Sequence, residues 1–171
     1  AMKGEIDFSA SLVERVSLLA GLDESVLNKV ADELSPTKGA VELIEAIHAI
    51  GGYAAAVSGG FIQLLEPLKN TLNLDFAKAN TLEVVDGKLS GKVIGELVDS
   101  GVKAATLLAL AKKLELDVAQ TIAIGDGAND LKMMKQAGLS IAFCAQPIVR
   151  ESADIVIDTR DLSQVIALLP S

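Results

Sequence analysis

Residues 121–130 read TIAIGDGAND, and this stretch carries the strongest fold signal in the chain. Its first four residues form a short apolar run, which is typical of a strand buried on both faces. Glycines and aspartates follow at once, in a turn that leads into a predicted helix over residues 129–137. A buried strand that turns directly into a helix is typical of an α/β protein with a parallel sheet.

The same alternation of strand and helix extends through most of the chain. Further short apolar strands are predicted at residues 53–57, 140–143 and 155–157, and further helices at residues 41–50, 101–115 and 162–169. A β-hairpin is predicted where residues 82–85 and 89–94 flank Asp86-Gly87, a strong two-residue turn signal. We therefore expect an α/β fold with a parallel sheet, helices on both faces of that sheet, and one hairpin.

The first 35 residues differ from the rest, because they carry two helical patterns and no strand. Apolar residues recur at helical spacing over residues 8–19 and again over residues 26–34. The sequence Ser35-Pro36-Thr37 then interrupts the pattern. The length of the chain suggests one domain with a small appendage.

Composition excludes several classes of partner. The chain has 171 residues, of which 50% are hydrophobic, so it can bury a sizeable core. Its net charge of -8 argues against nucleic acid or an anionic membrane as a partner, since both are polyanions. Cys144 is the single cysteine, so no internal disulfide forms, and no apolar run is long enough to span a membrane. We expect a cytoplasmic protein.

The glycine turn of residues 125–130 is the first candidate site. The carboxylates of Asp126 and Asp130 flank this turn, close together in the sequence. A hard cation binds several oxygens in a small volume, so the arrangement suits a divalent metal ion. The alternative is an ordinary turn in which Asp130 or Asn129 caps the next helix.

The second candidate site is Ser58-Gly59-Gly60, which follows the predicted strand at residues 53–57 and opens a helix that ends near residue 68. A hydroxyl beside glycine N–H groups at a helix start suits an oxyanion. The alternative is an ordinary strand-to-helix turn. A serine nucleophile is disfavoured, because Gly-x-Ser-x-Gly is absent and His48, the single histidine, lies within a predicted helix.

Two cations also stand out by their positions. Lys103 lies in the first turn of its predicted helix, where the helix dipole disfavours a positive charge, so it is placed to meet an anion. Arg15 interrupts the apolar stripe of the first helix and could hold a carboxylate at the edge of an apolar pocket. The alternatives are a tolerated misplacement for Lys103 and a guanidinium that extends into water for Arg15.

Taken in order, these segments resemble the phosphoserine phosphatases of the haloacid dehalogenase (HAD) superfamily. The resemblance runs over essentially the whole chain. Met2-Lys3-Gly4-Glu5 with Phe8 and the run up to Arg15-Val16 resembles the helical cap of that family. Ser58-Gly59-Gly60-Phe61 resembles its second motif, Lys103 its third, and residues 125–130 its fourth. The resemblance implies a Rossmann-like HAD core at residues 36–171 and a partial helical cap at residues 1–35.

The resemblance also implies a role for each matching residue. Asp126 and Asp130 would bind magnesium, with Asn129 orienting the metal and phosphate. Ser58, the N–H of Gly59, Lys103 and Asn129 would bind the phosphate, and Lys103 would also neutralise its charge during catalysis. The substrate-binding residues would be Arg15, which would bind a carboxylate, together with Met2, Phe8 and Gly60.

One motif of the family is missing from these 171 residues. An Asp-x-Asp-x-Thr sequence, which supplies the nucleophile and the acid and base, follows the first and central strand in that family. Neither the motif nor that strand is found here, so we expect the chain by itself to be inactive and to dimerise or swap an element in compensation. Either the sequence is a shortened piece of a longer enzyme, or Met2 is a start codon.

The leading hypothesis is therefore magnesium-dependent hydrolysis of a small phosphomonoester, L-phosphoserine above others, through a phospho-aspartate on the complete polypeptide. This activity belongs to serine biosynthesis. Two alternatives remain open: a catalytically inactive module that binds phosphate or an amino acid, with a regulatory role, and a HAD phosphatase for another phosphorylated metabolite that carries a carboxylate.

Overall fold

A computed structural model describes residues 5–170 of the chain. The described residues form two compact units. The first unit runs as far as Val98 and includes the residues from Asp161 onward, and the second is Asp99–Arg160. Each unit contains one three-stranded sheet. In the described part of the chain, no helix has the length and apolar character needed to cross a bilayer.

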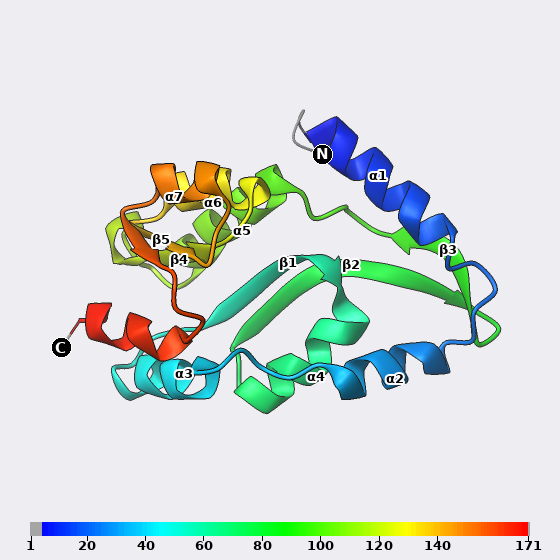
Figure 1. The fold of residues 1–171 in the computed structure, drawn as a ribbon, viewed down its shortest axis with the longest axis horizontal. Coiled ribbons are helices and arrows are strands. Elements are labelled where there is room, and N and C mark those ends of the chain that lie inside the picture. The colour runs from blue at the N-terminus through cyan, green and yellow to red at the C-terminus, as the bar shows by residue number, and fades with distance from the viewer. Residues whose placement is uncertain (1–4, 171) are drawn as a thin grey trace. The chain divides into compact units, whose positions relative to one another are not determined.

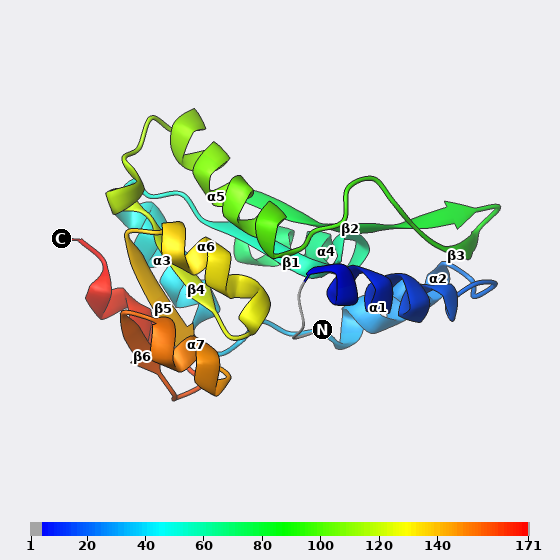
Figure 2. The same cartoon turned by 90° about the horizontal axis from the view of Figure 1, so that it is seen from above.

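The sheet of the first unit combines parallel and antiparallel pairing. Strand β1 (Ala55–Phe61) pairs in parallel with β2 (Phe76–Val85), which pairs antiparallel with β3 (Lys88–Ile94). Figures 1 and 2 show the β2–β3 hairpin extending well past the end of β1. Asp86 and Gly87 join the two strands with φ values of 50° and 76°, the left-handed conformation that a two-residue hairpin turn requires. The predicted hairpin is confirmed.

The helices of the first unit cover its sheet and its hairpin. They are α1 (Glu5–Ser17), α2 (Ser25–Glu33), α3 (Ala40–Ala49), α4 (Ile62–Leu72) and the 3₁₀ helix η3 (Leu162–Leu168). Helix α1 contacts β3, α4 contacts β1 and β2, and α2 contacts α4. In Figure 1, α1 lies on one side of β2 and β3, and α2 and α4 lie on the other. The closing helix predicted at residues 162–169 is a 3₁₀ helix that contacts α3.

The two N-terminal helices share a core with the hairpin. Leu12 and Val16 of α1 are buried, and they pack in one cluster with Leu82 of β2 and Leu89 of β3. Burial of such side chains stabilises the contact by about 1.5–3 kcal/mol each. For this reason α1 and α2 belong to the same compact unit as the first sheet, and no division between compact units falls at residue 35. The assignment of residues 1–35 as a separate cap stays a prediction.

His48 has a structural role. Its Nε2 lies 2.8 Å from Oδ2 of Asp75, and the same oxygen accepts a hydrogen bond of 2.7 Å from the N–H of Ala54. Burial raises the pKa of Asp75, but the Ala54 N–H and the His48 ring together outweigh burial and lower that pKa below its ordinary value. These bonds tie α3 to the residues that precede β1 and β2.

The sheet of the second unit is entirely parallel. Strand β4 (Ile122–Gly125) pairs with β5 (Leu139–Phe143), which pairs with β6 (Ile155–Ile157). These strands match the three short apolar runs of the sequence to within two residues. The middle strand, β5, is buried over Ser140–Phe143, as expected for a strand in a parallel sheet.

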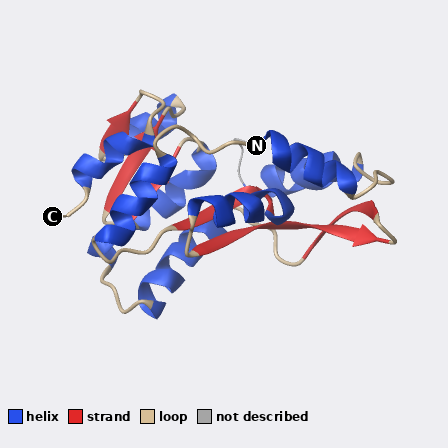
Figure 3. Ribbon diagram, turned by 90° about the horizontal axis from the view of Figure 1, so that it is seen from below, coloured by secondary structure: helices blue, strands red, loops and turns tan. Residues whose placement is uncertain are grey.

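Three α-helices accompany this parallel sheet, besides the short 3₁₀ helices η1 (Val118–Gln120) and η2 (Ala128–Asp130). The α-helices are α5 (Ser100–Lys113), α6 (Leu131–Gln136) and α7 (Pro147–Ser152). Helix α6 contacts β4, β5 and α5, and Figure 3 shows helices beside the strands. The side chain of Asp99 caps α5 by accepting a hydrogen bond of 2.9 Å from the N–H of Val102. Together the units confirm the predicted α/β class with parallel strands flanked by helices.

The described strands form two separate sheets and not a single continuous one. In the described residues, β1 and β4 are both edge strands, because β1 pairs only with β2 and β4 only with β5. Each of these strands therefore keeps one edge without a strand partner inside its own unit. The predicted site residues that follow a strand, Ser58 and Asp126, belong to these two edge strands or follow them directly.

Candidate active site

Ser58-Gly59-Gly60 lies inside β1, and not after it as the sequence analysis expected. Val57 pairs with Lys78, and the next paired residue, Phe61, pairs with Asn80. The residues between Val57 and Phe61 therefore form a bulge, because they outnumber the residues opposite them on β2. Helix α4 begins only after Phe61. Glycine allows this irregular backbone, and bulges of this kind occur often beside active sites.

Within the bulge, Ser58 is half-buried and its hydroxyl has a defined partner. The N–H of Gly60 donates a hydrogen bond of 3.0 Å to Oγ of Ser58. Phe8 of α1 packs against the same bulge, because a Cβ added to Gly59 would lie 3.0 Å from Cζ of Phe8. Phe8, Ser58 and Gly59 therefore lie close together in the first unit.

Lys103 and Asp130 form a buried ion pair in the second unit. Nζ of Lys103 lies 2.8 Å from Oδ1 of Asp130, and the two side chains are only 7% and 9% exposed. The anion that Lys103 meets in this structure is therefore the Asp130 carboxylate. The predicted contact between Lys103 and a phosphate stays a prediction.

The other oxygen of Asp130 organises the turn after β4. Oδ2 of Asp130 accepts hydrogen bonds of 3.0 Å from the N–H of Asp126 and 3.2 Å from the N–H of Gly127. The carbonyl of Asp126 in turn accepts a hydrogen bond of 2.9 Å from the N–H of Gln146. The backbone of Asp126 is therefore held on both sides. Sequence reasoning missed the part played by Gln146, since a backbone N–H leaves no signal in the sequence.

The side chain of Asp126 is free to bind a cation. It is exposed, and within residues 5–170 no hydrogen bond or ion pair engages its carboxylate. A hard cation such as Mg²⁺ prefers oxygen ligands of this kind. No cluster of three or more acidic, histidine or cysteine side chains that could hold a metal occurs among the described residues. Asp126 fits a magnesium ion, whereas both oxygens of Asp130 already have protein partners.

The remaining predicted site residues are Arg15, Met2, Gly60 and Asn129. Arg15 is exposed, and its Nε donates a hydrogen bond of 3.4 Å to the carbonyl of Ser11 in its own helix. Its role as a carboxylate ligand stays a prediction. Met2 lies outside the described residues. Gly60 belongs to the bulge described above, and Asn129 lies near Gly127 in the turn after β4.

The predicted site residues thus fall into two groups, one in each unit. The first unit holds Phe8, Arg15, Ser58, Gly59 and Gly60, and the second holds Lys103, Asp126, Asn129 and Asp130. The first group offers a hydroxyl and backbone N–H groups beside an aromatic ring. The second offers a buried cation and an exposed carboxylate. Hydroxyl and N–H groups are suited to bind a phosphate, and an exposed carboxylate is suited to bind a divalent cation.

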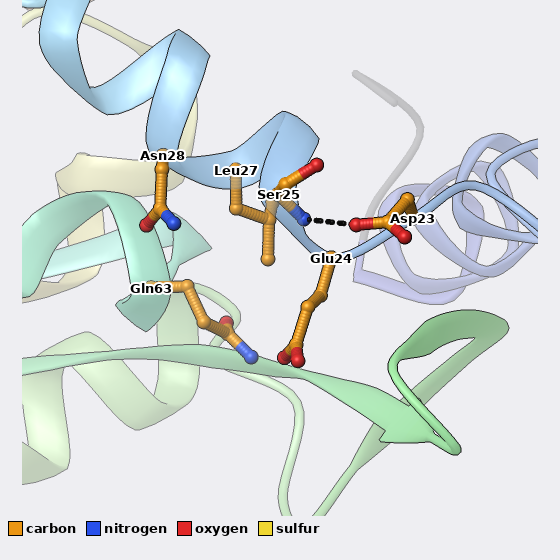
Figure 4. Close-up of a pocket in the computed structure, with 6 residues that line it drawn as sticks. All are labelled: Asp23, Glu24, Ser25, Leu27, Asn28 and Gln63. Atoms are coloured by element: carbon orange, nitrogen blue, oxygen red, sulfur yellow. Dashed lines mark hydrogen bonds between the residues drawn. The ribbon is translucent and has the colours of Figure 1, made fainter.

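A separate pocket lies elsewhere in the first unit (Figure 4). Its volume is about 430 Å³, and it is lined by Asp23, Glu24, Ser25, Leu27, Asn28 and Gln63. The N–H of Ser25 donates a hydrogen bond of 2.9 Å to Asp23, and this bond lowers the pKa of that carboxyl. Both acidic side chains would repel a phosphate. The pocket contains none of the predicted site residues.

A comparison with protein families identifies the family of this chain. The model of the haloacid dehalogenase-like hydrolases matches residues 4–135. The chain belongs to this family. The match includes the bulge in β1, Lys103 of α5 and the turn after β4, so the three candidate motifs lie within the family's own pattern.

Individual members of the family resemble the chain closely. A phosphoserine phosphatase of Streptomyces coelicolor is 50% identical over 169 residues, which cover 99% of this chain and 41% of that protein. The phosphoserine phosphatase of Streptococcus thermophilus is 48% identical over 169 residues, and the match covers 79% of its length. The chain therefore spans less than half of the first relative and about four-fifths of the second.

Solved structures show the same relationship. A substrate-bound phosphoserine phosphatase complex superimposes with a TM-score of 0.91 at 44% identity, covering 95% of this chain and 78% of that one. A phospho-aspartyl intermediate analogue of phosphoserine phosphatase superimposes with a TM-score of 0.90, also at 44% identity, covering 94% and 77%. The HAD fold expected from the sequence is thereby confirmed.

Proposed function

We propose that this chain is the phosphate- and magnesium-binding part of an L-phosphoserine phosphatase, which in its complete form hydrolyses phosphoserine to serine and phosphate through a phospho-aspartate. The observation that carries the proposal is the turn after β4, where a buried Lys103–Asp130 pair stands beside the exposed carboxylate of Asp126. The names of the similar proteins support the choice of substrate.

The proposed phosphate ligands come from both groups of residues. The hydroxyl of Ser58 and the N–H of Gly59 donate to phosphate oxygens, and Asn129 assists them. The ammonium of Lys103 neutralises part of the phosphate charge while Asp130 keeps that ammonium in place. Donors and charges fixed in advance around a transferring phosphoryl group are the main source of catalysis in this kind of reaction.

Asp126 is the proposed magnesium ligand. A bound Mg²⁺ supplies positive charge beside the phosphate oxygens. The chain's own contribution is to hold Asp126 through the Asp130 and Gln146 hydrogen bonds, so that its carboxylate stays at the surface of the turn. Asp130 contributes by orienting this turn, and its additional role as a metal ligand belongs to the same proposal. Arg15 is proposed to hold the carboxylate of the substrate, with Phe8, Gly60 and Met2 around it.

Calorimetry with L-phosphoserine and MgCl₂ tests this function. We expect saturable binding that falls at least about tenfold in Ser58→Ala, a loss of about 1.4 kcal/mol, because one hydroxyl donor to the phosphate is removed. Ser90→Ala is a matched control, since the N–H of Lys92 donates to Oγ of Ser90 as the N–H of Gly60 donates to Ser58. Absence of binding by the unchanged chain, or equal losses in both variants, would contradict the proposed site.

The same preparation tests catalysis. These 171 residues contain no Asp-x-Asp-x-Thr sequence, and Asp126 is assigned to the metal. We expect negligible release of phosphate from L-phosphoserine at saturating magnesium. Measurable turnover would contradict this expectation, and its loss in Asp126→Asn would show that the turnover depends on the turn after β4.

We also propose that two copies of the chain associate, as a homodimer or by exchange of an element. The edges of β1 and β4 that have no strand partner within their own units support this proposal, because an unpaired strand edge readily accepts another strand. Light scattering should give about twice the mass of one chain. A folded monomer at micromolar concentration would contradict the proposal.

A further inference from the structure

Asn80 is a buried polar residue outside the predicted site. It lies in β2 opposite Phe61 and is 0% exposed. Its Nδ2 donates a hydrogen bond of 2.9 Å to the carbonyl of Gly59, and its Oδ1 accepts one of 2.7 Å from the N–H of Val98. A buried amide is costly unless both of its ends are hydrogen-bonded, and here both are.

The partners of Asn80 fix the direction in which its amide points. The N–H of Val98 can only donate and the carbonyl of Gly59 can only accept, so the oxygen must face Val98 and the nitrogen must face Gly59. The reversed amide would place its NH₂ group against the N–H of Val98, donor against donor. It would also place its oxygen against the carbonyl of Gly59, acceptor against acceptor. Asn80 is therefore a donor to the bulge in β1 with no alternative orientation.

The hydrogen bond from Asn80 acts on the peptide group between Gly59 and Gly60. This group is planar, and its C=O and N–H point in opposite directions. Its carbonyl accepts from Asn80, and its N–H donates to Oγ of Ser58 at 3.0 Å. The peptide is thus held at both ends, although glycine would otherwise leave it free to rotate.

This arrangement determines whether the Ser58 hydroxyl can donate a hydrogen bond to a ligand. A hydroxyl has one donor and two acceptor sites, and here one acceptor site of Ser58 is taken by the N–H of Gly60. The hydroxyl hydrogen points away from that N–H and remains able to donate to another oxygen. A rotated Gly59–Gly60 peptide would present its carbonyl to Ser58, and the hydroxyl would then donate to that carbonyl.

We propose that Asn80 is a positioning residue of the phosphate site: by holding the Gly59–Gly60 peptide, it keeps the Ser58 hydroxyl as a donor to a phosphate oxygen. The inference rests on the proposed function, because it assigns that donor to the phosphate of the substrate. Asn80 itself touches no substrate and acts through Gly59, Gly60 and Ser58.

Asn80→Asp tests the inference with little change in shape. The new carboxylate can still accept from Val98, but it replaces the donor to Gly59 by an oxygen that repels the carbonyl. We expect the affinity for L-phosphoserine, measured by calorimetry with MgCl₂, to fall about tenfold, which is the ratio that a free energy of about 1.4 kcal/mol produces.

Gln63→Glu is the matched control in the same unit. Nε2 of Gln63 donates to the carbonyl of Leu82 at 2.8 Å, and its Oε1 accepts from the N–H of Leu82 at 3.2 Å. This substitution removes the same kind of amide donor from the backbone of β2 at Leu82 and leaves the hydrogen bonds of Gly59 and Gly60 in place. We expect it to leave the affinity for phosphoserine within about twofold of that of the unchanged chain, a difference of about 0.4 kcal/mol.

A double-mutant cycle separates positioning from a general structural role. If Asn80 acts through the Ser58 hydroxyl, Asn80→Asp should weaken binding no further in the Ser58→Ala background. Additive losses in the cycle, or equal losses in Asn80→Asp and Gln63→Glu, would overturn the inference. If Asn80→Asp fails to fold by circular dichroism, Asn80→Thr, which suits a strand but is too short to reach both partners, takes its place in the same cycle.

The test also distinguishes the inference from the function on which it rests. If the unchanged chain binds no phosphoserine, the proposed function fails and takes the inference with it. If the unchanged chain and Asn80→Asp bind phosphoserine equally well, the inference alone fails.

Discussion

Replacing Lys103 with methionine will lower the free energy of unfolding by about 3–5 kcal/mol, because it leaves the Asp130 carboxylate buried without its counter-charge. The two side chains are 7% and 9% exposed, so water cannot take the place of the missing ammonium. Urea unfolding followed by circular dichroism measures the loss.

Two further variants identify the cause of this loss. Lys112→Met changes an exposed lysine near the other end of α5 and should change the free energy of unfolding by no more than about 0.5 kcal/mol. The double variant Lys103→Met/Asp130→Asn should recover most of the stability, since an amide leaves no buried charge and still accepts from the N–H of Asp126. A loss below about 1 kcal/mol in Lys103→Met would show that the pair is well solvated.

Local sequence signals were enough to predict most of the elements. The parallel strands β4, β5 and β6 are short apolar runs, and the hairpin is marked by Asp86-Gly87, whose backbone conformation few other residue pairs adopt. Each of these signals lies within a few neighbouring residues. Helix α7 was missed although Pro147, at its start, is a residue that favours the first turn.

The bulge in β1 could not be predicted in the same way. Serine followed by two glycines after an apolar run is equally compatible with a turn that ends the strand. The strand continues to Phe61 because Phe61 pairs with Asn80, and that pairing depends on a strand elsewhere in the chain. Register between strands is a long-range property that the local pattern does not contain.

The role of Asp130 shows the same limit within the candidate site. From sequence, Asp126 and Asp130 are equivalent carboxylates on one glycine turn. In the structure, Asp126 is exposed, whereas Asp130 is buried against Lys103, which lies 27 residues earlier in the chain. The family resemblance named all three residues, but only the tertiary packing of α5 beside α6 separates the buried carboxylate from the exposed one.

Gly125→Ala will damage both stability and the site, because no side chain fits between β4 and Asp130. A Cβ at position 125 would lie 2.5 Å from Cβ and 2.9 Å from Cγ of Asp130, closer than such atoms approach. The buried Asp130 would have to move, and its bonds to Lys103 and to the turn would lengthen. We expect a loss of about 1–3 kcal/mol in the free energy of unfolding.

Gly127→Ala is the control for this effect, since it lies in the same turn. A Cβ there would meet Oδ1 of Asn129 at 3.0 Å, the far end of a side chain that can rotate away. Its expected cost in urea unfolding is below about 1 kcal/mol. Because Gly125→Ala moves Asp130, it should also weaken Mg²⁺-dependent binding of phosphoserine, by displacing the backbone that presents Asp126. Equal stability in the two variants would mean that Asp130 is not fixed in place, and the buried pair would then no longer explain how the turn is held.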